Sequence, residues 1–224
     1  MDYSAMSLDD ADWVKRFRDP YKPLIVDIGC GMGVSLLGLA GYQHHHTTST
    51  SPVGIDYAEC NFVGGDLKSL LVGYSSGIAT KWGLGETTQF VHQSAEGLVH
   101  QIQQHYPGPI ALVMIQFPTP FRLATKSKEE GNSQLPADWT SGFMVTPSLL
   151  KQVKDLLQEP KNNKPQLAFK PHLLLQSNCE DVAVAMREMA LSAGWICVPS
   201  ASPVEKLPVG NNLPQRTLEW IKAG

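Results

Sequence analysis

An apolar strand that runs into a glycine-rich turn and then into a helix constrains this chain more than any other feature. The segment 24–28 reads LIVDI, glycines follow at positions 29, 31 and 33, and helical periodicity starts at Val34. Glycine lets the backbone approach a ligand closely, and a helix N-terminus offers unpaired N–H groups. The dinucleotide fingerprint G-x-G-x-x-G does not fit, because the branched Val34 follows Gly33. The segment therefore predicts a site for a different nucleotide-like ligand.

Short apolar segments alternate with helical patterns along the rest of the chain. The predicted strands are 24–28, 53–56, 88–92, 110–115, 167–169 and 195–198. The predicted helices are 34–40, 67–74 with an extension toward Trp82, 95–105, 146–158 and 180–193. Strands that alternate with helices favour a Rossmann-like, doubly wound, mostly parallel α/β sheet covered on both faces.

The length of 224 residues suits one such domain, which we expect to span 1–224. Within it, residues 1–22 read as an N-terminal extension and 122–142 as a long irregular loop. No apolar run approaches the length of a membrane span, and the first residues lack the pattern of a signal or transit peptide. We therefore expect a location in the cytosol or nucleus.

The cysteines and histidines do not form a recognisable metal motif. Cys30, Cys60, Cys179 and Cys197 are scattered, which predicts free thiols in a reducing compartment. The His44–His46 run stands in a polar Thr/Ser-rich stretch with no carboxylate or Cys at ligand spacing. We expect a surface loop there and no metal site.

The net charge of −3 is distributed unevenly. Residues 23–110 carry two basic side chains against six acidic ones, whereas residues 111–175 carry eight basic against five acidic. The basic second half could follow a phosphate backbone, but solvated lysines on helices and loops explain it equally well.

In a doubly wound sheet, ligands bind outside the carboxyl ends of the strands, so the residues that follow each strand are the candidates for a site. Asp27 and the glycine turn follow the first strand, and Asp56 ends the second, where a carboxylate can accept ribose hydroxyls. Ser94 follows the third strand and is equally suited to cap the next helix. The rigid segment Phe117–Phe121, with two prolines, follows the fourth.

The spacing Asp27-x-Gly29-x-Gly31-x-Gly33 resembles the first motif of S-adenosylmethionine (SAM) methyltransferases. Together with Phe117-Pro-Thr-Pro-Phe121 and Val145-Thr-Pro-Ser-Leu-Leu150, it is similar to the tRNA (guanine-N7)-methyltransferase family. The resemblance runs from about residue 24 to the C-terminus, where Thr217, Glu219 and Lys222 match a Thr/Glu/basic motif.

This resemblance implies methyl transfer from SAM to N7 of a guanosine in tRNA, with no DNA or membrane partner and with the need for a partner subunit left open. It implies that the cofactor is held by Asp27, Gly29, Gly31, Gly33, Asp56, Tyr57, Ser94, Ala95 and Gln116. It places the acceptor base against Thr119, Arg122, Asn178, Thr217 and Glu219. Guanine N7 has a lone pair and no proton to lose, so placement dominates catalysis.

The chain departs from the family at positions that hold the base. Thr119 and Asn178 stand where the family has Asp, Ser94 replaces a carboxylate near the adenine, and Arg122 and Lys126 are the nearest substitutes for a basic cluster. Neutral groups make weaker hydrogen bonds to a guanine N–H than carboxylates do. Two alternatives therefore stay open: a paralogue with little or no activity that serves as an interaction module, and a methyltransferase with a small-molecule or protein substrate.

Overall fold

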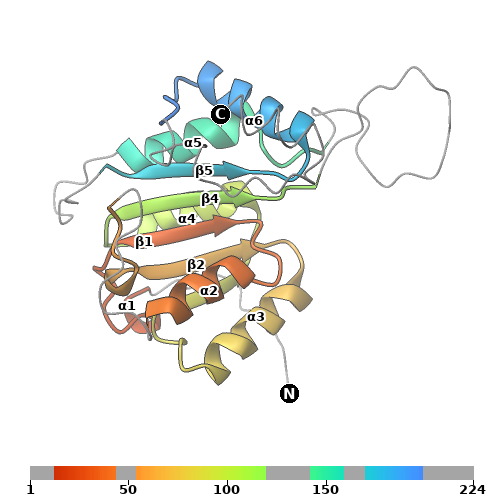
Figure 1. The fold of residues 1–224 in the computed structure, drawn as a ribbon. Helices are drawn as coiled ribbons and strands as arrows, with labels where there is room; N and C mark the ends of the chain where they lie inside the picture. Colours follow the sequence, from red (N-terminus) through yellow and green to blue (C-terminus); the bar gives the residue numbers. More distant parts are fainter. Residues whose placement is uncertain (1–12, 44–53, 120–141, 159–169, 199–224) are drawn as a thin grey trace, which may run out of the picture.

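A five-stranded sheet in the order β3-β2-β1-β4-β5 forms the centre of the molecule, and every strand pair in it is parallel. The computed structural model describes residues 13–43, 54–119, 142–158 and 170–198. The strands are β1 (Leu24–Ile28), β2 (Asn61–Asp66), β3 (Thr88–His92), β4 (Ile110–Gln116) and β5 (His172–Gln176). Figure 1 shows the labelled strand arrows pointing the same way, so their carboxyl ends share one edge.

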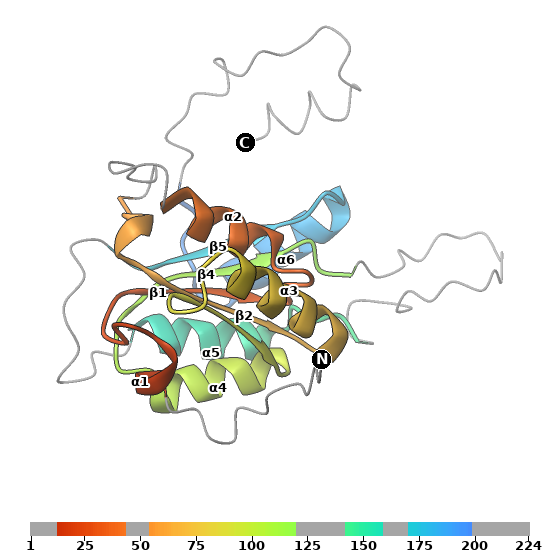
Figure 2. The ribbon, with the colours of Figure 1, turned by 90° about the horizontal axis from the view of Figure 1, so that it is seen from below.

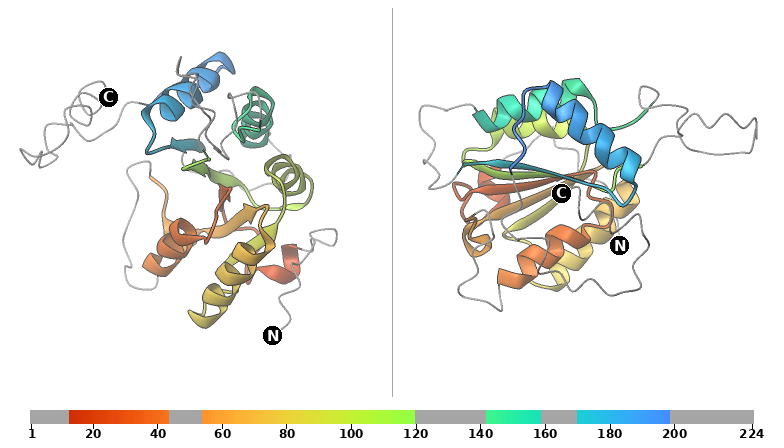
Figure 3. Two further views of the ribbon diagram at one scale, coloured as in Figure 1. Left: turned by 90° about the vertical axis from the view of Figure 1, so that its right-hand side faces the viewer. Right: turned by 45° about the horizontal axis from the view of Figure 1, so that its top comes forward.

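Helices cover both faces of this sheet (Figure 3). They are α1 (Trp13–Arg16), α2 (Val34–Gln43), α3 (Ser69–Lys81), α4 (Ala95–His105), α5 (Pro147–Gln158) and α6 (Glu180–Ser192). One core cluster joins α4, α5 and α6 to the sheet, and a second joins α2 and α3 to the opposite face. The prediction of a doubly wound, parallel α/β fold is confirmed.

Burial on both faces explains why β1 is apolar at nearly every position. All five of its residues are buried, with Leu24, Val26 and Ile28 in the first cluster and Ile25 in the second. Side chains alternate across a strand, so Asp27 lies on the same face as Ile25, under α2 and α3. The strand order reverses between β1 and β4, which is where doubly wound folds bind ligands.

Residues 13–22 belong to the packed domain and are more than an extension. Trp13 and Phe17 are buried, and their rings meet edge-on that of Tyr106 at centroid distances of 6.0 Å. The Tyr106 hydroxyl donates to the Lys22 carbonyl at 2.6 Å, and burial raises the pKa of that hydroxyl above its usual range. This contact fixes the chain just before it enters β1.

Several predicted elements agree with the structure and two do not. The helices and the first, third and fourth strands lie within a few residues of their predicted positions. The second strand is Asn61–Asp66 and not 53–56, and the predicted strand 195–198 has no regular structure. Trp195 instead turns its indole toward the helical layer and donates to the Leu150 carbonyl at 3.3 Å.

Other predictions fall outside the described residues. These are the strand at 167–169, the His44–His46 loop and the irregular loop apart from Gly142. The fifth described strand is β5, which the sequence did not suggest. Among the described helices, none is long and apolar enough to cross a bilayer.

Candidate functional site

The glycine turn after β1 is held against the end of β2 by a set of short backbone hydrogen bonds. The N–H groups of Gly29 and Cys30 both donate to the Gly65 carbonyl, at 2.8 and 3.0 Å. Gly33 closes the turn by donating to the Cys30 carbonyl at 2.8 Å. All three glycines of the turn have positive φ, at 74°, 54° and 69°, which explains their alternation in the sequence.

Two of these glycines differ in what surrounds them. A Cβ on Gly33 would overlap the Phe90 ring, so this position must be glycine for packing. A Cβ on Gly31 would meet no other atom within 4 Å, so its backbone faces open space. The turn therefore packs on the sheet through Gly33 and leaves its backbone accessible at Gly31.

Asp66, at the end of β2, binds this turn through its side chain. Its Oδ2 accepts the Gly31 N–H at 3.0 Å, and its Oδ1 accepts the Lys68 N–H at 2.8 Å. The side chain is half-buried. The carboxylate expected at the carboxyl end of the second strand is therefore Asp66.

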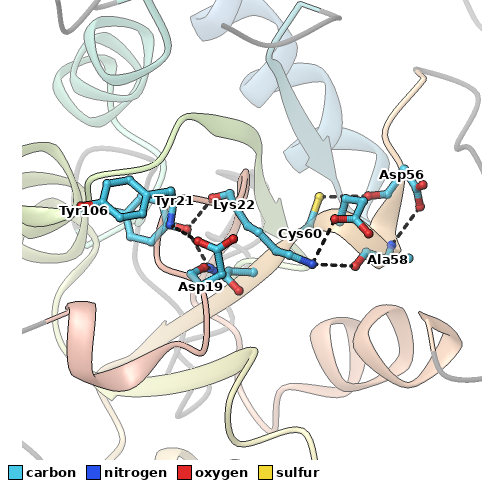
Figure 4. Close-up of polar contacts among 9 residues, drawn as sticks. Asp19, Tyr21, Lys22, Asp56, Ala58, Cys60 and Tyr106 are labelled. Carbon is cyan, nitrogen blue, oxygen red and sulfur yellow. Dashed lines mark hydrogen bonds and ion pairs between the residues drawn. The ribbon is translucent and has the colours of Figure 1, made fainter. Parts of the chain in front are cut away.

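This observation corrects the assignment of Asp56 and Tyr57 to the cofactor site. Asp56 precedes β2 and caps the short helix η2 (Tyr57–Glu59), where its Oδ1 accepts the Ala58 N–H at 3.0 Å. Figure 4 shows it near Lys22 and Cys60. Because β2 begins only at Asn61, these residues lie at the amino-terminal edge of the sheet. A parallel sheet places this edge opposite the glycine turn, so neither residue lies where a ligand of the turn would bind.

Asp27 provides a second carboxyl group beneath the turn. Its side chain is 2% exposed, and within the described part of the chain no donor lies within hydrogen-bond distance of its Oδ1. Burial first, and then the nearby Asp66, raise the pKa of Asp27 from 3.8 to about 7. A buried acceptor without a partner is costly, and a donor from a ligand would relieve that cost.

Cys30 lies in the same turn, but its thiol is unsuited to nucleophilic chemistry. Burial, followed by the negative charges of Asp27 and Asp66, raises the pKa of Cys30 well above its usual range. Thiolates are the reactive form, so this thiol stays protonated at neutral pH. The Cys30 side chain fills the space beside Gly64, where a Cβ would come within 2.8 Å of the Cys30 Sγ. We therefore assign the Cys30 side chain a packing role.

The ends of β3 and β4 border the same edge. Ser94 caps α4 by accepting the Gly97 N–H at 3.1 Å, with partly buried Ala95 as the first residue of the helix. Gln116 donates to the Gln176 side chain at 2.9 Å, and so joins the ends of β4 and β5. The capping function that the sequence allowed for Ser94 is confirmed.

Phe117 follows Gln116 with an unusual backbone conformation. Its φ is 50°, the one positive value among the described non-glycine residues, and its side chain is 52% exposed. Its N–H donates to the Gln176 carbonyl at 2.8 Å, which holds the chain in this conformation. Bulky residues rarely adopt positive φ, and such conformations concentrate at functional sites.

The predicted acceptor residues are only partly described. Thr119 and Asn178 are both exposed, at the carboxyl ends of the neighbouring strands β4 and β5. Arg122, Thr217 and Glu219 lie outside the described residues. Of the basic residues in the second half, Lys154 already donates to the Ala193 and Gly194 carbonyls, at 3.0 and 2.8 Å.

Sequence reasoning missed Asp66, although a signal was present. Residues 61–66 read NFVGGD, a mostly apolar segment with a carboxylate at its last position. The segment 24–28, LIVDI, has its carboxylate at the second-last position. Gly64 and Gly65 make a strand at this position hard to predict, because glycine weakens strands. The structure supplies the reason for both glycines, since side chains there would overlap Phe90 and Leu98.

Comparisons with known proteins give no family assignment for this chain. No family model matches it, and no curated protein matches it. It is similar in structure to an rRNA methylase from Streptococcus thermophilus, with 18% identity, a TM-score of 0.31, and coverage of 50% of this chain and 48% of that one. A SAM-dependent methyltransferase from Agrobacterium tumefaciens gives 14% identity, a TM-score of 0.44, and coverage of 75% and 44%.

The antibiotic-resistance methyltransferase Kmr gives 14% identity, a TM-score of 0.43, and coverage of 84% of this chain and 78% of that one. The chain thus spans less than half the length of the Streptococcus and Agrobacterium proteins. TM-scores below 0.5 at such identities do not identify an activity, so a function for this chain has to be argued from its own residues.

Proposed function

We propose that this chain is a SAM-dependent methyltransferase that modifies N7 of a guanosine in tRNA. The observation that carries the proposal is the glycine turn 29–33, held on the Gly65 carbonyl and on Asp66 at the carboxyl edge of the sheet. The motif that forms this turn is also the one that resembles SAM methyltransferases.

The residues around the turn suit the chemical groups of SAM. Asp66 can accept ribose hydroxyls, because a carboxylate has lone pairs left after it binds two amides. Asp27 offers a buried acceptor to a cationic amino group, and the open space at Gly31 leaves room for a ligand against the backbone. When bound, SAM would supply an electrophilic methyl group.

The acceptor side of the proposal rests on Phe117 and Thr119. An exposed aromatic ring at the end of β4 provides a flat apolar surface suited to a base. The Thr119 hydroxyl, exposed two residues later, can exchange a hydrogen bond with the edge of such a base. These groups hold the acceptor in place, which is the main catalytic requirement when N7 has no proton to lose.

Calorimetric titration with SAM tests the cofactor site, with Asp66→Asn as the variant and Asp56→Asn as its matched control. Loss of a hydrogen bond to a charged group costs about 1.5–3 kcal/mol, so Asp66→Asn should weaken binding by roughly 10-fold or more. Asp56→Asn should bind like the wild type, since Asp56 lies at the opposite edge. Equal effects of the two substitutions, or no heat with SAM, would contradict the assignment.

Incubation of bulk tRNA with labelled SAM, followed by cleavage at N7-methylguanosine, tests the acceptor. We expect label at guanosine, and a faster reaction in Thr119→Asp because a carboxylate binds a guanine N–H more strongly. An unchanged rate would remove Thr119 from the site. SAM binding without label on tRNA would show that the acceptor is wrong while the cofactor is right.

A second function, that of a binding module that retains the SAM site, is favoured by one observation. The two residues that replace the base-holding Asp residues of the resemblance, Thr119 and Asn178, are neutral and exposed. Such a module would bind SAM in the titration above and methylate neither tRNA nor other substrates.

A further inference from the structure

Asp27 faces a side of the sheet that carries almost no charge. Its side chain lies under α2 and α3, which Figure 2 shows on one side of the sheet, with α4 and α5 on the other. α2 has no charged residue, and the one in α3 is Lys81, in the turn farthest from the carboxyl edge. The adjoining strand β4, which reads IALVMIQ, has none. These elements therefore supply no nearby cation to balance an ionised Asp27.

The titratable groups at the carboxyl edge do not balance it either. Asp66 is itself a carboxylate, and its negative charge disfavours a second one beside it. Both Asp66 oxygens accept backbone N–H groups, so they offer the neighbouring carboxyl group no donor. The Cys30 thiol is neutral, because burial raises its pKa above the usual range. Lys68 and His92 are exposed, whereas Asp27 is buried. A carboxyl group in these surroundings is more stable with its proton, in agreement with its pKa of about 7.

A ligand that brings a positive charge to this turn would change that balance. An opposite charge within about 4–6 Å of a carboxyl group lowers its pKa by roughly 1–3. SAM and its demethylated product, S-adenosylhomocysteine, both carry an α-amino group, which is protonated at pH 6. The backbone at Gly31 faces open space, so such a ligand has room against the turn. An ammonium group there can take the place of the proton as the positive charge beside Asp27.

We propose that Asp27 selects ligands with a cationic group at the glycine turn, by exchanging its own proton for the positive charge of the ligand. This inference rests on the proposed SAM site. The proton leaves the carboxyl group for the solvent, the ammonium group of the ligand keeps its protons, and a carboxylate–ammonium pair forms. A neutral ligand cannot displace the proton. The preference for a cationic ligand should therefore increase as pH rises toward 7.

Calorimetry of the full chain at pH 6, in two buffers with different ionisation enthalpies, counts the protons released on binding. With a pKa of about 7, the free Asp27 carboxyl group is about nine-tenths protonated at this pH. Binding of S-adenosylhomocysteine should release between about 0.4 and 0.9 protons, since the ammonium group lowers the pKa in the complex. 5′-Methylthioadenosine shares the nucleoside but lacks the amino acid, so it should release none.

Two substitutions separate Asp27 from the histidine at the same edge. Asp27→Asn should bind S-adenosylhomocysteine without releasing protons. His92→Gln is the matched control, because glutamine can still donate to the Leu67 carbonyl, which the His92 Nε2 reaches at 3.0 Å. It should release as many protons as the wild type.

The wild type alone provides a second measurement, which stands even if Asp27→Asn does not fold. Its affinity for S-adenosylhomocysteine should fall roughly 3- to 5-fold from pH 7 to pH 6, while that for 5′-methylthioadenosine stays constant. Binding of S-adenosylhomocysteine without proton release, or equal release by the wild type and Asp27→Asn, would overturn this inference and leave the proposed SAM site intact. An absence of heat with both ligands would contradict the proposed SAM site itself, and this inference with it.

Discussion

At the scale of single residues, the most consequential group is the buried carboxyl of Asp27. It lies on a central strand, under two helices, and next to a second carboxyl group. Both surroundings disfavour its charge, which explains why its pKa is raised to about 7.

This shift predicts a pH dependence of stability. The native chain holds the Asp27 proton more tightly than the unfolded chain, so rising pH removes it from the unfolded chain first. The group therefore costs about 1.4 kcal/mol of unfolding free energy per pH unit between pH 3.8 and about 7. Asp27→Asn removes that loss. In urea unfolding without SAM, the unfolding free energy of the variant should rise relative to that of the wild type from pH 4 to pH 7. Above pH 7 the difference between the two proteins should stay constant. A difference that does not change with pH would contradict this origin.

The backbone of Phe117 gives a second prediction at this scale. Phe117→Gly and Phe117→Ala remove the same half-exposed ring, but only glycine accepts a φ of 50° without strain. We expect the Gly variant to be more stable than the Ala variant by roughly 1–2 kcal/mol. Thermal unfolding of the pair measures this difference. A more stable Ala variant would show that the backbone is not strained there.

The conformation of the turn glycines could be predicted from sequence because their requirement is local. A turn with alternating positive φ needs glycine whatever surrounds it. Asp66 could not be predicted in the same way. Its importance follows from strand pairing between β1 and β2, which brings it to the Gly31 amide from 35 positions away.

At the scale of elements, α5 begins at a side-chain cap. The Leu149 N–H donates to Thr146 Oγ1 at 3.1 Å, with Pro147 as the first residue of the helix. Thr146→Ala should destabilise the protein by about 1 kcal/mol, whereas Thr146→Ser keeps the hydroxyl and should cost less. Urea denaturation of the three proteins tests this. Equal losses in both variants would point to the lost methyl group instead of the cap.

Elements were predictable where periodicity and end signals agree. α5 has both, with a Thr-Pro start and a strongly one-sided apolar face, and α4 was found with its bounds unchanged. β2 and β5 were not. β2 contains two glycines that only tertiary contacts justify, and β5 lies at the edge of the described sheet with three of its five residues half-buried and two exposed.

At the scale of the whole molecule, a ligand that binds only the native state must raise its stability. At a SAM concentration 100 times the dissociation constant, the gain is about 2.7 kcal/mol. For a domain of this size, that gain raises Tm by roughly 5–11 °C. Differential scanning fluorimetry should show this increase with SAM and with its demethylated product. The Asp66→Asn variant should show a smaller increase in Tm at the same concentration. No increase in Tm with either compound would argue against the proposed SAM site.

The fold class was predictable at this scale because it depends on the order of elements and not on their bounds. A shift of β2 by several residues leaves the alternation of strands and helices unchanged, and the sheet order with it. The proposed acceptor site could not be predicted equally well, because the residues proposed for it are spread over segments far apart in the chain.

The two amide contacts of Asp66 have a kinetic consequence. Both of its oxygens accept backbone N–H groups of the chain itself, one from the turn and one from the start of the next segment. Binding then requires no folding of the turn. In stopped-flow mixing, the observed association rate should rise in proportion to ligand concentration, without the plateau that a slow rearrangement of the site would impose.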